Sequence, residues 1–217
     1  MAEAAPRALI SDWGGVLTSP IRNSVKDWIA AERLDEEHYR TLMRGWMRAA
    51  YSDTGENPIH ALERGETSVA EFERTLATRL RTLDGTPVVA EGLLSRMFGG
   101  FRPVEPMYEV LRRARGGGVR TALLSNSWGN GYPRDQFADL FDITVISGEV
   151  GMRKPEPRIY AHVLDALGLP PGTCVFIDDM RPNIEAAEEA GMIGVHHTDP
   201  DATIARLESL FGLPLRG

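Results

Sequence analysis

Residues 8–15 read Ala-Leu-Ile-Ser-Asp-Trp-Gly-Gly, an apolar run that ends in an aspartate and two glycines. The run at 8–11 predicts a buried strand, because short apolar runs bounded by turn residues are typical of one. The two glycines permit a turn that residues with a Cβ would resist. Asp12 is therefore expected directly after a strand, at the start of a loop.

After residue 103 strand patterns recur and alternate with helices. Strands are predicted over 119–124, 143–146, 174–177 and 193–196, and helices through Tyr108 to 116 and over 136–141, 158–167 and 183–190. Such alternation favours right-handed crossovers and a parallel sheet that is covered on both faces. The expected fold class is α/β, with a Rossmann-like parallel sheet.

Residues 20–97 break the alternation with helical patterns alone. An apolar stripe runs from Val69 to Leu83 at three-and-four spacing, and Ser68 with Glu71 forms a capping box pattern. Further helices are indicated around residues 25–29 and 42–47. We therefore expect an α/β core of residues 1–18 and 100–217 with a helical bundle inserted at 19–99.

The composition narrows the class of partner. A formal net charge of −7 and a pI near 5.3 disfavour a nucleic-acid partner, so a small molecule is expected instead. The single cysteine, Cys174, excludes an intramolecular disulfide and is expected in a buried strand. The sequence shows neither a secretory signal nor an apolar run that could span a membrane, which favours a cytoplasmic protein.

Polar residues follow the predicted strands at several points. They are Asp12, Ser125, Lys154 and the pair Asp178-Asp179. Ligands of parallel sheets bind at the carboxyl ends of the strands. An aspartate, a hydroxyl, a lysine and paired carboxylates there suit phosphate chemistry, as nucleophile, phosphate donors and a site for a hard cation.

Four segments in chain order resemble the motifs of the haloacid dehalogenase-like hydrolase superfamily. They are residues 11–17 (Ser-Asp-Trp-Gly-Gly-Val-Leu), 124–126 (Leu-Ser-Asn), 151–155 (Gly-Met-Arg-Lys-Pro) and 176–179 (Phe-Ile-Asp-Asp). The spacing is similar to that of the subgroup with a helical cap between motifs one and two. The resemblance covers essentially the whole chain and implies a hydrolase, with a phosphatase acting on a small phosphorylated metabolite as the expected activity.

The resemblance also implies roles for the motif residues. Asp12 would be the nucleophile that becomes an aspartyl phosphate, while Ser125 and Lys154 would hold the phosphoryl oxygens. Magnesium would be the cofactor, held by Asp179 with Asp178 beside it, by Asp12 and by the backbone carbonyl of Gly14.

Other residues near the motifs are weaker candidates. Asn126 and Trp13 are expected at the substrate, and Trp128 with Trp13 would wall the pocket or serve only in packing. Asn183 resembles the asparagine that supports the family's site. His196-His197 is not expected to bind metal, because adjacent strand residues point to opposite faces.

The sequence departs from the family at Gly14, where most of its phosphatases carry a second aspartate as the general acid and base. This loss predicts a slow enzyme, since such catalysis is typically worth about 10²- to 10⁴-fold. Leaving groups that need no proton, such as acyl phosphates and sugar 1-phosphates, should suffer least.

Two other functions stay open. One is a catalytically silent protein that binds a phosphorylated ligand, motivated by Gly14. The other is a dehalogenase without metal, against which the Asp178-Asp179 pair argues. Taken alone, Asp12 also suits a turn and the aspartate pair suits a helix cap. Lys154 alone would suit an exposed surface charge. Only two of the 24 basic residues are lysines, however, which favours a role for Lys154 as a point charge that binds phosphate.

Overall fold

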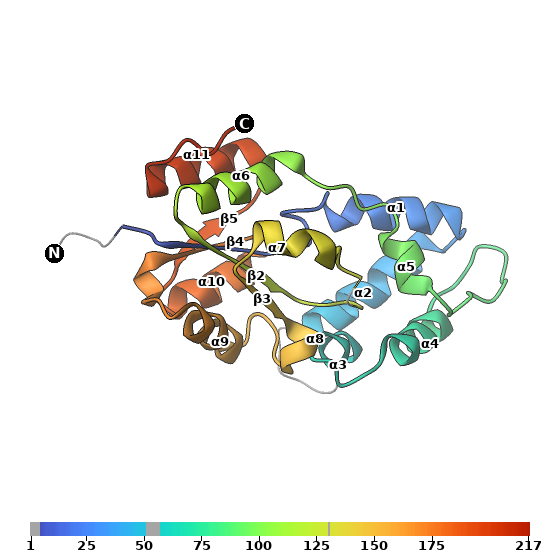
Figure 1. Ribbon diagram of the computed structural model, residues 1–217. Coiled ribbons are helices and arrows are strands. Elements are labelled where there is room, and N and C mark those ends of the chain that lie inside the picture. The colour runs from blue at the N-terminus through green and yellow to red at the C-terminus, as the bar shows by residue number, and fades with distance from the viewer. Residues whose placement is uncertain (1–4, 51–56, 130) are drawn as a thin grey trace.

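The computed structural model describes residues 5–50, 57–129 and 131–217. Its centre is a parallel sheet of five strands in the order β3-β2-β1-β4-β5 (Figure 1). The strands are β1 (Ala8–Ser11), β2 (Arg120–Ser125), β3 (Ile143–Ile146), β4 (Cys174–Asp178) and β5 (Ile193–His196). The predicted fold class is confirmed, and each predicted strand lies within one residue of its observed bounds.

The register brings three strand ends to the same level. Ser11, the last residue of β1, pairs with Leu123 of β2 and with Ile177 of β4. Asp12 therefore follows β1 at the level of Leu124 of β2 and Asp178 of β4, and Ser125 lies one residue further along β2. The topology thus places chemically active residues from three distant parts of the sequence beside one another.

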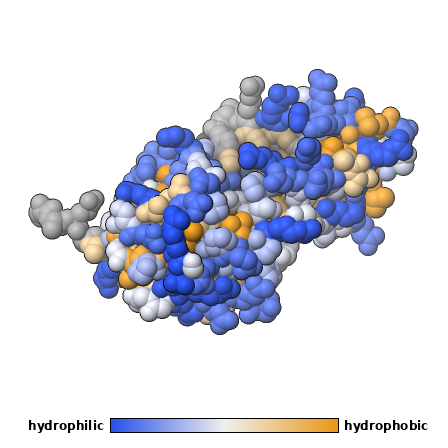
Figure 2. Space-filling model, turned by 90° about the horizontal axis from the view of Figure 1, so that it is seen from above, coloured by the Kyte–Doolittle hydropathy of each residue, from blue (hydrophilic) through white to orange (hydrophobic). Residues whose placement is uncertain are grey.

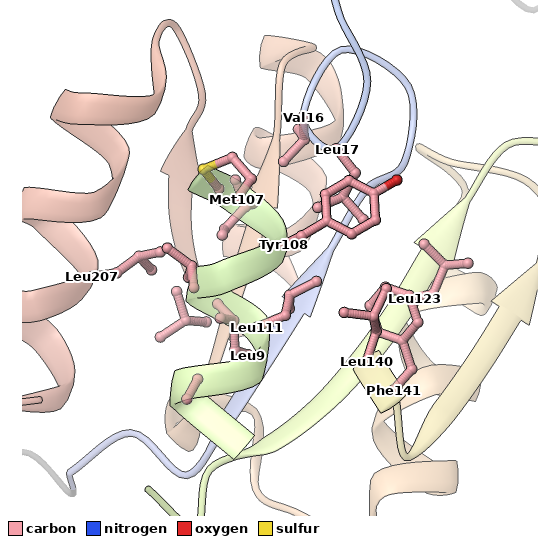
Figure 3. Close-up of a cluster of buried hydrophobic side chains, with 14 of the residues drawn as sticks. Leu9, Val16, Leu17, Met107, Tyr108, Leu111, Leu123, Leu140, Phe141 and Leu207 are labelled. Carbon is pink, nitrogen blue, oxygen red and sulfur yellow. The ribbon is translucent and has the colours of Figure 1, made fainter. Parts of the chain in front are cut away.

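Helices cover both faces of the sheet because its strand residues are buried on both sides. Leu9 packs with α6 (Glu105–Gly116), α7 (Phe137–Leu140) and α11 (Pro200–Phe211) on one face, as Figure 3 shows. Ala8 and Ile10 point to the other face. There α9 (Pro157–Leu167) and α10 (Arg181–Glu189) complete the core, and Cys174 lies buried as a free thiol, as predicted.

The remaining elements after α6 are short. They are α8 (Ser147–Val150) after β3 and two 3₁₀ turns, η1 (Arg134–Gln136) and η2 (Pro171–Thr173). Among the described residues, no helix has the length and apolar character needed to cross a membrane.

The chain between β1 and α6 is helical, as predicted. It forms α1 (Ile21–Ala31), α2 (Glu36–Ala50), α3 (Pro58–Glu63), α4 (Val69–Arg79) and α5 (Leu93–Phe98). These helices lie together beside the sheet (Figure 1) and share a hydrophobic cluster around Trp28, Phe72 and Met97. The division into domains at residues 18 and 100 stays a prediction.

The predicted stripe from Val69 to Leu83 begins where the helix begins but is wrong at its C-terminal end. The capping box of Ser68 and Glu71 is present, but the helix stops at Arg79 because Leu80 adopts an extended backbone conformation. Leu83 lies beyond the helix with 72% of its surface exposed, and Val69 is 37% exposed. The apolar spacing in the sequence continues to Leu83, although the backbone leaves the helix at Leu80.

Candidate active site

The residues expected to carry the chemistry gather at the carboxyl edge of the sheet. Asp12 follows β1, Ser125 ends β2, and Asp178 ends β4 with Asp179 after it. Lys154 comes from the loop between α8 and α9.

Lys154 is the charged centre of this group. Its side chain is 1% exposed, and its Nζ lies 2.8 Å from Oδ1 of Asp12 and 2.6 Å from Oδ2 of Asp178. Burial alone would lower the pKa of Lys154, but the two carboxylates outweigh it and raise that pKa above its usual range. The ammonium therefore stays protonated at any working pH.

The carboxylates outnumber that single positive charge. Burial raises the pKa of Asp12 to about 7, against the opposing effect of Lys154, and the charge of Asp178 adds to the rise. Burial and the neighbouring Asp178 also raise the pKa of Asp179 to about 6. The site therefore carries more negative charge than its own residues balance.

A divalent cation fits this excess of negative charge. Asp12, Asp178 and Asp179 each offer an oxygen, and these oxygens lie within 4.8 Å of one another. Carboxylate oxygens are preferred ligands of Mg²⁺. The donor set thus matches the magnesium predicted from the sequence.

Asp178 is held from several sides. Besides Lys154, the side chain of Asn183 donates to both of its carboxylate oxygens at 3.0 and 3.1 Å, and the backbone N–H of Met180 donates to Oδ1 at 2.8 Å. Asn183 therefore holds Asp178 in place. The alternative that this aspartate pair caps a helix is wrong for α10. The N-cap of α10 is Met180, and no side chain forms a cap hydrogen bond there.

The two glycines after Asp12 have different surroundings. A Cβ placed on Gly14 would meet no atom within 4 Å. A Cβ on Gly15 would overlap the carboxylate of Asp179, and Gly15 has a positive φ of 79° that side chains disfavour. Gly15 thus allows Asp179 to approach the loop.

The hydroxyl of Ser125 lies 2.9 Å from the hydroxyl of Tyr132. Burial raises the pKa of Tyr132 to about 12, so this phenol stays neutral and can donate a hydrogen bond at ordinary pH. Asn126 is engaged with the backbone of Lys154, giving its Nδ2–H to the carbonyl at 3.0 Å and accepting from the N–H at 2.8 Å. It fixes the loop that carries Lys154.

A buried ion pair joins α3 to the same loop. Arg153 and Glu63 form it with side chains 6% and 8% exposed, and Glu63 also accepts from the indole N–H of Trp128 at 2.8 Å. Sequence reasoning missed Glu63, Arg153 and Tyr132. Arg153 adjoins Lys154 in the third motif, but nothing in the sequence marks Glu63 as its partner.

A cavity of about 580 Å³ opens beside these residues. Trp13 lines it and also packs edge-on against Tyr108 and Tyr132, so its two expected roles coexist. Trp128 lines the cavity too, while it contacts Phe72 and Phe98 of the helical segment. The wall contains Gly14, Ser125 and Asn126, so the cavity reaches the carboxyl edge of the sheet.

His196 ends β5 and His197 follows it, and a ring nitrogen of each has a hydrogen-bond partner. His196 Nε2 lies 3.0 Å from the backbone oxygen of Asp179, and His197 Nδ1 lies 2.8 Å from the hydroxyl of Thr203.

Comparison with known proteins gives one family. The model of the haloacid dehalogenase-like hydrolases matches residues 6–191. A sesquiterpene phosphatase of Aspergillus oryzae is 31% identical over 69% of this chain and 77% of that protein. The chloroplast flavin mononucleotide hydrolase 1 of Arabidopsis thaliana is 30% identical over 64% of this chain and 60% of its own length.

Some relatives are much longer. The bifunctional epoxide hydrolase 2 of mouse is 27% identical over 96% of this chain, which spans 39% of the mouse protein.

Solved structures share the fold at lower identity. A family enzyme from Bacteroides thetaiotaomicron, in complex with magnesium and inorganic phosphate, is 21% identical with a TM-score of 0.65 over 89% of this chain and 94% of its own. A HAD-like hydrolase from Porphyromonas gingivalis is 22% identical with a TM-score of 0.66 over 94% of this chain and 98% of its own.

Proposed function

Because the chain belongs to the haloacid dehalogenase-like hydrolase family, we propose that it is a magnesium-dependent phosphatase of a small phosphorylated metabolite. The observation that carries the proposal is the buried Lys154, which bridges Asp12 and Asp178 within a group of three carboxylates. Such a group suits a divalent cation and a phosphoryl group together. The names of the relatives, a sesquiterpene phosphatase and a flavin mononucleotide hydrolase, agree with this chemistry.

Asp12 is the proposed nucleophile. One of its carboxylate oxygens attacks phosphorus in line with the bond to the leaving oxygen, and that bond breaks to leave an aspartyl phosphate. The leaving oxygen takes its proton from water, because Gly14 offers no acid. A water molecule then attacks the same phosphorus, which releases inorganic phosphate and restores the carboxylate.

Lys154 and Ser125 are the proposed ligands of the phosphoryl oxygens. The ammonium of Lys154 has three donors, of which two point to Asp12 and Asp178, so the third can reach a phosphoryl oxygen. Because burial keeps this charge away from bulk water, it stabilises the developing negative charge more strongly than an exposed lysine would.

Asp12, Asp178 and Asp179 are the proposed ligands of Mg²⁺, together with the backbone carbonyl of Gly14. When bound there, the ion would supply positive charge next to the nucleophile and the phosphoryl oxygens. In this proposal Asn183 keeps Asp178 in position, and Asn126 does the same for the loop of Lys154.

Residues 19–99 are the proposed cap, which would exclude bulk water and contact the substrate. The helices α4 and α5 support this, because Val69 and Leu94 line the same cavity as Ser125.

The decisive test is magnesium-dependent phosphate release from a panel of phosphorylated metabolites and an activated aryl phosphate. The matched control is Asp12→Asn, for which we expect a loss of at least about a thousand-fold. Release that needs both magnesium and Asp12 would support a phosphatase. Equal release by both proteins would point to a contaminant, and no release would favour the silent, ligand-binding alternative.

Gly14 is expected to make this phosphatase slow. The open space around its Cβ position suggests that Gly14→Asp can be accommodated, and the restored carboxylate should raise turnover of poor leaving groups by about 10²-fold or more. Activated aryl phosphates should gain much less, since their leaving groups need no proton. An equal gain for both substrates would contradict an acid and base role at this position.

A further inference from the structure

The wall of the cavity next to the site is rich in aromatic and aliphatic side chains. Six of its lining residues are aromatic, and Ile21, Val69 and Leu94 are aliphatic. Arg102 is the one charged side chain among the lining residues. The aromatic members are Trp13, Phe98, Phe101, Tyr108, Trp128 and Tyr132.

A sugar, with hydroxyls on most of its carbons, would be poorly matched to such a wall. Each hydroxyl that leaves water needs a hydrogen-bond partner, because burying one without a partner costs on the order of 1–3 kcal/mol. Of the polar side chains nearest the site, Asn126 binds the backbone of Lys154, and Ser125 is assigned to the phosphate end. An apolar group, in contrast, gains free energy from every methylene placed against this wall.

Exposed apolar side chains at the cavity also favour an apolar ligand. Of the five large hydrophobic residues that stand out as exposed in the described part of the chain, Ile21 (45%) and Val69 (37%) line this cavity. Figure 2 shows a face of the molecule that is largely hydrophilic, with apolar residues in small patches. Contiguous apolar surface that stays exposed marks interaction sites, and ligand-binding grooves are among them.

We propose that the substrate is a phosphate monoester of an apolar alcohol, whose hydrocarbon part fills this cavity while its phosphate lies at Asp12 and Lys154. The inference rests on the proposed function, since the phosphate end is assigned there. The volume of about 580 Å³ is within the range of small-molecule sites, about 300–1,000 Å³. The cavity is therefore large enough for a hydrocarbon group of metabolite size.

A homologous series of 4-alkylphenyl phosphates tests the proposal. A para-alkyl chain scarcely changes the acidity of the phenol, so the chemical step stays constant while the apolar surface grows. From methyl to butyl to octyl, we expect kcat/KM to rise by about two- to four-fold per buried methylene until the cavity is full. A flat or falling series, measured below the concentration at which the esters form micelles, would overturn the proposal.

A pair of exposed valines provides the matched variants. Val69→Thr keeps the shape of the side chain but places a hydroxyl in the cavity wall. Val89→Thr makes the same change at a residue that is 64% exposed and is not part of this wall. The octyl-to-methyl ratio of kcat/KM should fall several-fold for Val69→Thr and stay at the wild-type value for Val89→Thr. An equal response of the two variants would overturn the assignment of the cavity.

Binding separates this proposal from the proposed function. The corresponding 4-alkylphenyl phosphonates are not hydrolysed, and their affinity can be measured by calorimetry in the presence of magnesium. Affinity that rises with chain length would support an apolar ligand even if no phosphate ester is turned over. Binding that ignores chain length, or no binding of any phosphonate, would overturn the inference whatever the activity.

Discussion

Gly14 and Gly15 are neighbours in the loop after Asp12, yet the structure gives them opposite constraints. Gly14 faces open space, whereas Gly15 lies against the carboxylate of Asp179 with a φ of 79°. The first glycine leaves room for a side chain. The second lets a carboxylate come close to the loop, which any side chain would prevent.

We expect Gly15→Ala to weaken magnesium binding by at least about ten-fold, because the new methyl group displaces Asp179 from the carboxylate cluster. Gly85→Ala is the matched control, since Gly85 has the same φ of 79° but no atom within 4 Å of its Cβ position. Both variants should lose about 1–2 kcal/mol of unfolding free energy from backbone strain. Calorimetric titration with magnesium and chemical denaturation measure the two effects separately.

The comparison with Gly85→Ala shows whether weaker magnesium binding comes from the displaced Asp179 or from backbone strain. If both variants bind magnesium like the wild type, Asp179 does not depend on the approach that Gly15 allows. If both lose affinity equally, general strain is responsible and the contact with Asp179 is not.

Single residues also show how far the sequence could predict the site. Asp12, Ser125 and Asp178 were recognisable because each follows an apolar run, and parallel strands bring such ends together. Tyr132 lies in a loop whose path is set by tertiary packing, so its contact with Ser125 had no local signal. Asn126, predicted to contact the substrate, lines the cavity, and its side chain also holds the backbone of Lys154.

At the scale of elements, α3 and the loop before α9 are joined by charge. Glu63 ends α3 and pairs with the buried Arg153, and the next residue, Arg64, pairs with Glu156 at the start of α9. The end of α3 also meets α8, where a Cβ on Gly65 would overlap the carbonyl of Gly148. The helical segment is thus fixed to the loop that carries Lys154.

We expect Glu63→Ala to lower the free energy of unfolding by about 3–5 kcal/mol, because it leaves the guanidinium of Arg153 buried without its partner. Glu185→Ala is the control, as its pair with Arg181 is exposed and should change stability by no more than about 0.5 kcal/mol. Urea denaturation gives both values.

A double variant tests the pairing itself. Glu63→Ala with Arg153→Met should be less destabilised than the sum of the single changes, since neither charge is then left alone. Additive losses would mean that the two side chains contribute independently and that the ion pair does not join the elements.

The elements were predicted well where the pattern is local and less well where it is not. The strands and the helices α6, α9 and α10 follow apolar runs that the sheet buries on both faces, so composition and order sufficed. The end of α4 was wrong because the apolar spacing continued to Leu83, while the backbone left the helix at Leu80. How α3 packs on the third motif depends on residues 90 positions apart and could not be read from the sequence.

For the whole molecule, the important quantity is the charge collected at the centre of the fold. Three carboxylates surround one lysine, and burial raises the pKa values of Asp12 and Asp179 to about 7 and about 6. In the unfolded chain both aspartates titrate near 3.9. Between these values the folded protein binds more protons than the unfolded chain, so its metal-free form should lose stability as the pH rises.

We therefore expect the protein in EDTA to be more stable at pH 5 than at pH 7.5 as far as these two groups contribute, by on the order of a few kcal/mol. Asp179→Asn removes one of the charges and should flatten this dependence, with higher stability than the wild type at pH 7.5 in EDTA. Asp165→Asn, at an exposed position on α9, is the control and should leave the dependence unchanged. Thermal unfolding at a series of pH values measures this dependence of stability on pH.

Magnesium should reverse the order of stability of the wild type and Asp179→Asn. A cation that binds only the folded state stabilises it by RT ln(1 + [L]/Kd), and it replaces the protons that the carboxylates would otherwise need. The wild type should therefore gain most from magnesium at pH 7.5, while Asp179→Asn, with one ligand fewer, should gain little. If the metal-free wild type were instead as stable as Asp179→Asn at pH 7.5, Lys154 alone would balance the carboxylates, and the electrostatic argument for a metal at this site would fail.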